Sequence, residues 1–215
     1  MRIGMVCLII LCLSCGRDRV ILLPEIENAK ITNVKDVSPA YLFYDESKED
    51  SVELNRKNLI ITTNWLVNVD KRLTLKQALP SILKLQDKKR NAKMHKNENA
   101  KNYFTCNDTA IKNLGFLDFT DVFYFQGKSE TEEKSNEILL YFETENRIIT
   151  KDSELSPKSL ENYLSELLQN NDSINLKVIA NFNKNLTFQE YIKYISLLDT
   201  IKIDSIWVSN NEFIY

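Results

Sequence analysis

Residues 174–208 read INLKVIANFNKNLTFQEYIKYISLLDTIKIDSIWV, and this stretch specifies the architecture of the C-terminal half. From 174 to 180 apolar residues alternate with polar ones, apart from Ile179, as in a β-strand. Thr187 and Glu190 then form a capping box, and apolar residues follow at helical spacing. A last strand is predicted at 206–208. The unit is therefore a strand, a helix and a parallel strand, for which a right-handed crossover is expected.

The residues before this unit complete a domain that we place at 137–215. Two strands are predicted at 138–142 and 148–150, joined through Glu145 and Asn146. Ser156 followed by Pro157 starts a helix whose leucines share one face. The order β-β-α-β-α-β predicts an α+β fold, a two-layer mixed sheet with both helices on one face. The charged residues 127–136 are interpreted as a linker.

Residues 15–126 are predicted to form an N-terminal α+β domain. The apolar runs 59–63 and 65–69 suggest a hairpin, and Thr74 opens a helix with a capping box. Pro80 lies inside that helix and removes a backbone donor, so a kink or a delayed start is expected.

Three shorter elements are predicted after that helix. A strand is expected at 103–106, and a short helical turn at 110–114 is expected to stop at Gly115. A buried strand is expected at 122–125. The order suggests a duplication, in which 59–83 repeats the hairpin and helix of 139–168. The alternative is the chance similarity that many α+β chains show.

The first residues have the form of a secretory leader. Arg2 is followed by an apolar run from 3 to 13, which is too short to cross a bilayer as a helix, and then by Ser14 and Cys15. A cysteine directly after a small residue is the lipid-acceptor arrangement of bacterial lipoproteins. We therefore predict a signal peptide at 1–14, cleavage between Ser14 and Cys15, and lipid attachment to Cys15. An ordinary secreted protein is the alternative.

Composition argues against several function classes. The formal net charge of −2 gives no electrostatic case for nucleic acid. The single histidine, His95, lies in a polar stretch, and no Cys, His and Asp cluster has metal-ligand spacing. Cys106 would be the one cysteine of the mature domains besides Cys15, so no intramolecular disulfide framework is expected. We therefore predict no metal, no cofactor and no enzymatic activity.

The C-terminal pattern resembles the periplasmic domain of the ExbD/TolR biopolymer-transport family. The match covers the hairpin, the leucine-rich helix, a strand ending at Ala180 and Asn181, and a second helix opening near Phe188. The family has Asp where this chain has Asn181. A Leu-Pro pair, here Leu23 and Pro24, also occurs in the linker of ExbD-like proteins. The proton-coupling membrane helix of the family has no counterpart, so motor activity is not carried over.

The resemblance implies a binding role. We expect a lipid-anchored, non-enzymatic accessory or scaffold protein that binds subunits of a cell-envelope transport complex or a second copy of itself. The candidate partner-binding residues are Leu22, Leu23, Pro24, Asn181 and Phe188. The expected location is the outer membrane, facing the periplasm.

The alternative function is a lipoprotein that binds a small ligand or a glycan. It would use aromatic residues of the N-terminal half, namely Phe116, Phe119, Phe123, Tyr124 and Phe125. A concave pocket between the two halves would favour this function. A flat apolar patch or an unpaired strand edge would favour the scaffold.

Overall fold

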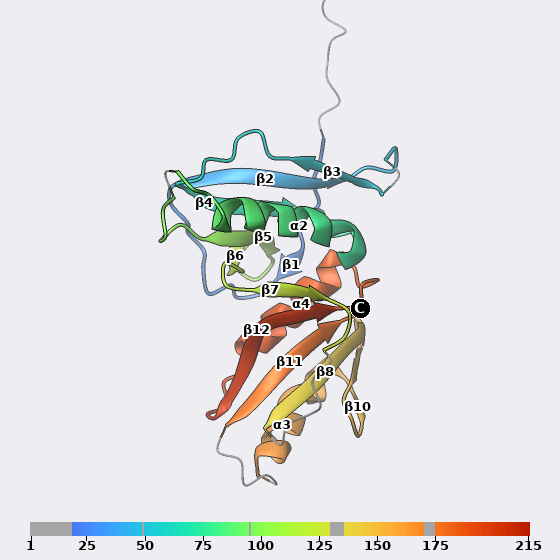
Figure 1. The fold of residues 1–215 in the computed structure, drawn as a ribbon. Coiled ribbons are helices and arrows are strands. Elements are labelled where there is room, and N and C mark those ends of the chain that lie inside the picture. Colours follow the sequence, from blue (N-terminus) through green and yellow to red (C-terminus); the bar gives the residue numbers. More distant parts are fainter. Residues whose placement is uncertain (1–18, 49, 95, 130–135, 170–174) are drawn as a thin grey trace, which may run out of the picture.

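The computed structural model describes residues 19–48, 50–94, 96–129, 136–169 and 175–215, which form two mixed β-sheets and the helices that pack against them (Figure 1). In the first sheet β3, β2, β4 and β5 are neighbours in that order, and β1 and β6 both pair with β5. Its strands are β1 (Glu25–Ile26), β2 (Val37–Tyr44), β3 (Val52–Asn55), β4 (Asn64–Val69), β5 (Asn102–Asp108) and β6 (Asn113–Asp118).

The second sheet has the order β10-β9-β8-β11-β12-β7. Its strands are β7 (Phe123–Gln126), β8 (Glu137–Thr144), β9 (Arg147–Ile149), β10 (Glu154–Leu155), β11 (Leu176–Phe182) and β12 (Ile206–Ile214). The strands β8, β11, β12 and β7 are parallel to one another, whereas β9 and β10 are antiparallel to their neighbours. The expected α+β fold with two layers is therefore confirmed.

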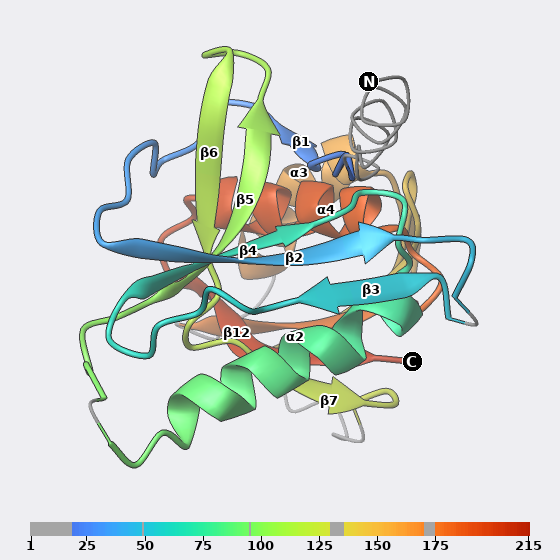
Figure 2. The same cartoon turned by 90° about the horizontal axis from the view of Figure 1, so that it is seen from above.

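The helices begin where the sequence places their caps. They are α2 (Leu75–Arg90), α3 (Leu160–Gln169), which follows a 3-10 turn (Pro157–Ser159), and α4 (Phe188–Thr200). Figure 1 shows α3 and α4 on the same face of the second sheet. Viewed from above, the first sheet lies across α2 and α4 (Figure 2). Both helices thus lie between the first sheet and the rest of the molecule.

The two halves repeat one arrangement. The strand order β3-β2-β4-β5 matches β9-β8-β11-β12, and in both halves a capped helix connects the last two strands. The sequences of these connections also correspond at one constant spacing. Residues 67–75 read VNVDKRLTL and residues 180–188 read ANFNKNLTF, so that Asn, Lys, Leu and Thr recur in equivalent places.

A local two-fold arrangement joins the repeats at these connections. Thr74 and Thr187 form an antiparallel bridge. The Leu75 N–H donates to the Leu186 carbonyl at 2.8 Å, and the Phe188 N–H donates to the Leu73 carbonyl at 2.6 Å. These two hydrogen bonds exchange equivalent residues, as a two-fold axis requires. The duplication expected from the sequence is therefore consistent with the topology.

One apolar core extends through both repeats. It contains Phe104 from β5, which stacks on Phe119 with ring centroids 3.8 Å apart. Phe104 also meets the edge of Phe188 in α4. Residues 127–136 were interpreted as a linker from the sequence. In the structure the Gly127 N–H donates to the Ile214 carbonyl, and the Ser129 N–H donates to the Asn181 side chain. The described ends of 127–136 are therefore bound to the second sheet.

We predict that each capping threonine stabilises the protein by about 1 kcal/mol, because its hydroxyl satisfies an otherwise unpaired N–H of the first helical turn. The Thr74 Oγ1 accepts from the Gln77 N–H, and Thr187 Oγ1 accepts from the Glu190 N–H. Urea unfolding of Thr74→Ala and Thr187→Ala measures this loss. The double variant should deviate from additivity, because the two residues form a bridge. Additive losses would contradict coupling between the two capping loops.

Several expectations for the N-terminal half are wrong. Residues 59–63 form turns rather than a strand, and β4 pairs in parallel with β2 instead of closing a hairpin. The two halves therefore correspond differently from the sequence-based expectation, in which 59–83 matched 139–168: helix α2 is the counterpart of α4, not of α3. A delayed helix start at Pro80 is also wrong, because the Thr74 cap fixes the first turn upstream of it.

The region after β5 also differs from expectation. Residues 109–112 form the turn of a hairpin between β5 and β6, so 113 and 114 are strand residues and Gly115 lies within β6 rather than after a helix. A side chain at Gly115 would place its Cβ 2.5 Å from the Ala29 Cβ, so this position requires glycine for close packing. The strand at β7 is present but not buried, since Phe123 and Phe125 are both exposed.

Candidate functional site

The residues proposed from sequence for partner binding lie in different environments. Ser14 and Cys15, like His95, are outside the described residues. Leu22 is exposed and Leu23 is half-buried, but Pro24 is buried. Hydrogen bonds of its backbone attach this segment to the domain. The Leu22 N–H donates to the Asp70 carboxylate, and the Pro24 carbonyl accepts from the Asn107 N–H. It continues into β1, the outer strand that pairs with β5 in the first sheet.

Asn181 and Phe188 belong to the core, with no solvent-exposed surface. The Asn181 amide donates to the Leu140 carbonyl at 3.5 Å, and its Oδ1 accepts from the Ser129 N–H at 2.8 Å. Asn68 holds the equivalent place in the first repeat and donates to the Ala40 carbonyl. These residues thus stabilise the repeats, and the proposed role for Asn181 and Phe188 in surface contact is wrong.

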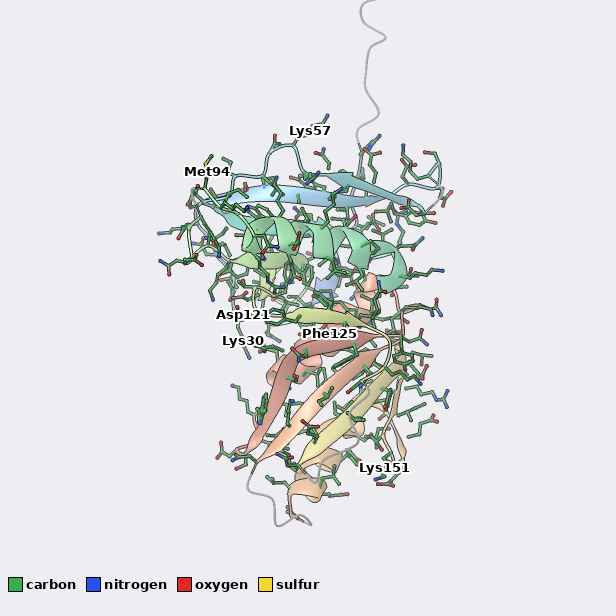
Figure 3. All side chains as sticks on the ribbon, viewed as in Figure 1. Lys30, Lys57, Met94, Asp121, Phe125 and Lys151 are labelled. Atoms are coloured by element: carbon green, nitrogen blue, oxygen red, sulfur yellow. The ribbon has the colours of Figure 1, made fainter. Side chains whose placement is uncertain are left out.

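A cavity of about 500 Å³ lies between the two repeats. Its walls come from β6 and the following turn, from α4 and from β12. Most of the lining is apolar, and it includes two of the aromatic residues singled out from the sequence, Phe116 and Phe119. The other apolar lining residues are Ile31, Leu117, Val122, Ile195, Leu198, Ile201, Ile206 and Val208. In Figure 3, Lys30 and Asp121 are labelled on this side of the molecule, at the level between the sheets.

A bulge in β12 shapes one wall of the cavity. Val178 pairs with Val208 and Ala180 pairs with Glu212, so the chain from 209 to 211 lies opposite the single residue Ile179. The Ser209 hydroxyl accepts from the Asn211 N–H at 3.2 Å and holds the bulge. Such bulges redirect side chains next to binding sites. Here the bulge places Ser209, Asn210 and Glu212 on the cavity lining.

Glu212 is the buried carboxyl of the site, with 8% of its surface exposed. Its Oε2 accepts from the Tyr191 hydroxyl at 2.8 Å. The Tyr191 hydroxyl lies 3.0 Å from that of Tyr124. Because Tyr191 donates its proton to Glu212, Tyr124 is the donor in the second hydrogen bond. The two phenols therefore form a chain that ends on one carboxyl oxygen.

Burial raises the pKa of Glu212 to about 7, although the hydrogen bond from Tyr191 opposes the shift. Burial and the Glu212 charge also raise the pKa of both Tyr124 and Tyr191 well above the ordinary tyrosine value. Both phenols are therefore protonated donors at neutral pH. The carboxyl, in contrast, can change its charge near neutrality.

The first repeat shows what this position contains when no polar site is present. Val67 corresponds to Ala180 in the repeat, and it pairs with Phe104 as Ala180 pairs with Glu212. A core phenylalanine in one repeat is thus replaced by a carboxyl in the other. Tyr191 likewise corresponds to Ala78. The polar pair is therefore not a requirement of the repeated fold.

The other charged groups at the cavity have partners. The Lys30 ammonium lies 2.7 Å from Asp199, and the Lys101 ammonium lies 2.7 Å from Asp118. Burial opposes ionisation of Asp118, but hydrogen bonds from Lys101 and Thr120 outweigh it and lower its pKa. Among the described residues, Tyr191 is the one hydrogen-bond partner of the Glu212 carboxyl.

A second surface feature is an aromatic strip on β7 and β12, consisting of Phe123, Phe125, Trp207 and Phe213. Phe125 stacks on Phe213 with ring centroids 5.3 Å apart, and Trp207 is 53% exposed. Figure 3 labels Phe125 on β7. The guanidinium of Arg90 lies over the Phe123 ring and donates to the Val122 carbonyl, so α2 covers part of this edge.

Three further findings concern metal ligands, the free thiol and membrane-spanning helices in the described part of the chain. No group of three His, Cys, Asp or Glu residues there could hold a metal ion. Cys106 is fully buried, and burial raises the pKa of its thiol, so it is an unreactive core residue. None of the helices in the described ranges is long and apolar enough to span a membrane.

Comparison with known proteins found no matching family model, no matching curated protein and no matching solved structure. The candidate site therefore rests on its own geometry. Sequence reasoning singled out Phe116 and Phe119 but missed Glu212, which stands among many scattered carboxylates. The correspondence between Glu212 and Phe104 follows from the strand pairing in the structure, so the sequence alone gave no signal for it.

Proposed function

We propose that this protein is a non-enzymatic, lipid-anchored binding protein of the cell envelope that accommodates a small apolar ligand between its two repeats. The observation that carries the proposal is the cavity of about 500 Å³ with a buried carboxyl on its wall. Ligand sites have this volume and this combination of apolar lining with few polar groups. The anchor is inferred from Ser14 and Cys15, with the outer membrane as the proposed location.

Ligand binding can be tested with an uncharged fluorescent probe, N-phenyl-1-naphthylamine. We expect its fluorescence to rise on binding to the mature domain and to be lost in Ile195→Trp, because an indole at this half-buried lining position takes up part of the cavity and obstructs the probe. Phe125→Ala is the matched control, since it removes an aromatic of the exposed strip only. Loss of binding in Phe125→Ala with retention in Ile195→Trp would place the probe on the strip and contradict the proposal.

A second candidate function is the accessory or scaffold role in an envelope transport complex. The aromatic strip supports it, because exposed aromatic residues are enriched in protein interfaces. The partner would be another envelope subunit or a second copy of this chain. Crosslinking of the tagged protein followed by identification of co-purifying subunits tests this role. Capture that is lost in both Trp207→Ala and Cys15→Ala would support it, and a monomer without partners would exclude it.

A further inference from the structure

We propose that the ligand is a small apolar molecule with a protonated amine, and that the amine binds the carboxyl of Glu212. This inference rests on the proposed ligand-binding function and adds the chemical class of the ligand. It is carried by the charge balance of the cavity, by the hydrogen bonds of Glu212 and by the contrast between the repeats.

The charge balance favours a cation. Among the charged lining residues, Lys30 is paired with Asp199, and Asp118 is paired with Lys101 from outside the lining. In the described part of the chain Glu212 has no such cationic partner. A buried carboxylate without a cation is unfavourable, and a ligand that brings one positive charge would neutralise it.

The hydrogen bonds leave one side of the carboxyl open. The phenol chain from Tyr124 through Tyr191 ends on Oε2, while Oε1 receives no hydrogen bond from the described residues. An ammonium group has three donors and no acceptor. One donor can bind Oε1, and the polar groups of Ser209 and Asn210 also line the cavity as further acceptors. A ligand carboxylate would instead face Glu212 with like charge.

The contrast between the repeats indicates that the carboxyl serves binding rather than folding. Phe104 occupies the position of Glu212 in the first repeat and packs there against three aromatic rings. An apolar residue is therefore compatible with this part of the fold. The buried carboxyl opposes folding when ionised, so its presence points to a ligand that it recognises.

The affinity for an amine should increase from pH 5 to pH 8, as Glu212 becomes ionised near its pKa of about 7. The other titratable or charged groups near it are Tyr124 and Tyr191, which stay protonated in this range, and the paired Lys30, Asp118 and Asp199. Arg90 lies close to Tyr124, and its positive charge opposes the rise in the pKa of Tyr124. Glu212 is thus the group whose charge changes in this interval.

The test uses three ligands that differ in one group: 4-phenylbutylamine, 4-phenylbutanol and 4-phenylbutyrate. Each displaces N-phenyl-1-naphthylamine from the mature domain at pH 8. We expect the amine to bind roughly 10- to 100-fold more tightly than the alcohol, the range of a charge-assisted hydrogen bond. The acid should bind more weakly than the alcohol. In Glu212→Gln the preference for the amine should disappear while the alcohol still binds.

Each outcome separates this inference from the proposed function. Equal affinities of the amine and the alcohol would overturn the amine assignment but leave a ligand cavity. Tightest binding of the acid would also overturn it, since Glu212 would then act as a protonated donor. Failure of the probe to bind would contradict the cavity function itself. The comparison of the three ligands on the unmodified protein holds even if Glu212→Gln does not fold.

Discussion

Raising the pH from 4.5 to 8 should lower the unfolding free energy of the unmodified protein, relative to Glu212→Gln, by on the order of 3 kcal/mol. The pKa of Glu212 is about 7 in the folded protein, compared with 4.5 for an unperturbed carboxyl. Between these values the folded state binds more protons than the unfolded state. Protonation of Glu212 therefore contributes its full share to the unfolding free energy below pH 4.5, and this share is lost as the pH rises through 7.

Urea unfolding at a series of pH values, without ligand, measures this effect as the difference between the two proteins. The difference removes the contributions of all other titrating groups, which the variant retains. Glu161→Gln, a change at an exposed position in α3, is a matched control and should show no such trend. Parallel pH profiles for the unmodified protein and Glu212→Gln would show that the carboxyl is not buried as described. A ligand amine should reduce the loss at pH 8.

Phe188→Ala should reduce the unfolding free energy by about 3–5 kcal/mol, the usual loss for truncating a buried phenylalanine. Phe188 has no exposed surface and contacts the rings of Phe104 and Tyr191. Its ring joins the core of the first repeat to α4 of the second. The truncation should therefore destabilise both repeats in one transition. Circular dichroism and tryptophan fluorescence during urea unfolding follow the two repeats together.

Phe125→Ala provides the comparison for this prediction, because Phe125 is 43% exposed. Its loss should be well under half that of Phe188→Ala, since less apolar surface leaves the protein interior. A small effect of Phe188→Ala combined with loss of a protein partner would return Phe188 to the surface role first inferred from the sequence. Two separate unfolding transitions would contradict the continuous core.

The helix starts of both halves and the strands of the C-terminal half were predictable because their signals are local. The capping boxes at Thr74 and Thr187 were both predicted, since a cap depends on residues three positions apart. The strands β8, β9 and β11 also follow from their short apolar patterns. In each case the neighbouring residues carry the information that the structure uses.

The strand β2 was not predicted from the sequence, and Pro39, its third residue, argues against a central strand. The structure tolerates Pro39 because successive residues of a strand direct their N–H and C=O groups to opposite sides. The carbonyls of Asp36 and Leu42 point to β4, so the missing N–H at Pro39 points to the other side. There β3 reaches only from Tyr41 onward. No hydrogen bond is lost, a fact that depends on the length of a neighbouring strand.

The amino-acid sequence determined the helix starts, most strands of the second sheet and the α+β class, because these follow from hydrogen bonds and burial within short segments. The tertiary structure determined the register of the repeats, the pairing of β4 with β2 and the exposure of β7. It also determined the site. Glu212 becomes a buried carboxyl only because a bulge in β12 and the chain of Tyr124 and Tyr191 bring distant segments around it. Contacts between residues far apart in the chain have no local pattern from which they could be read.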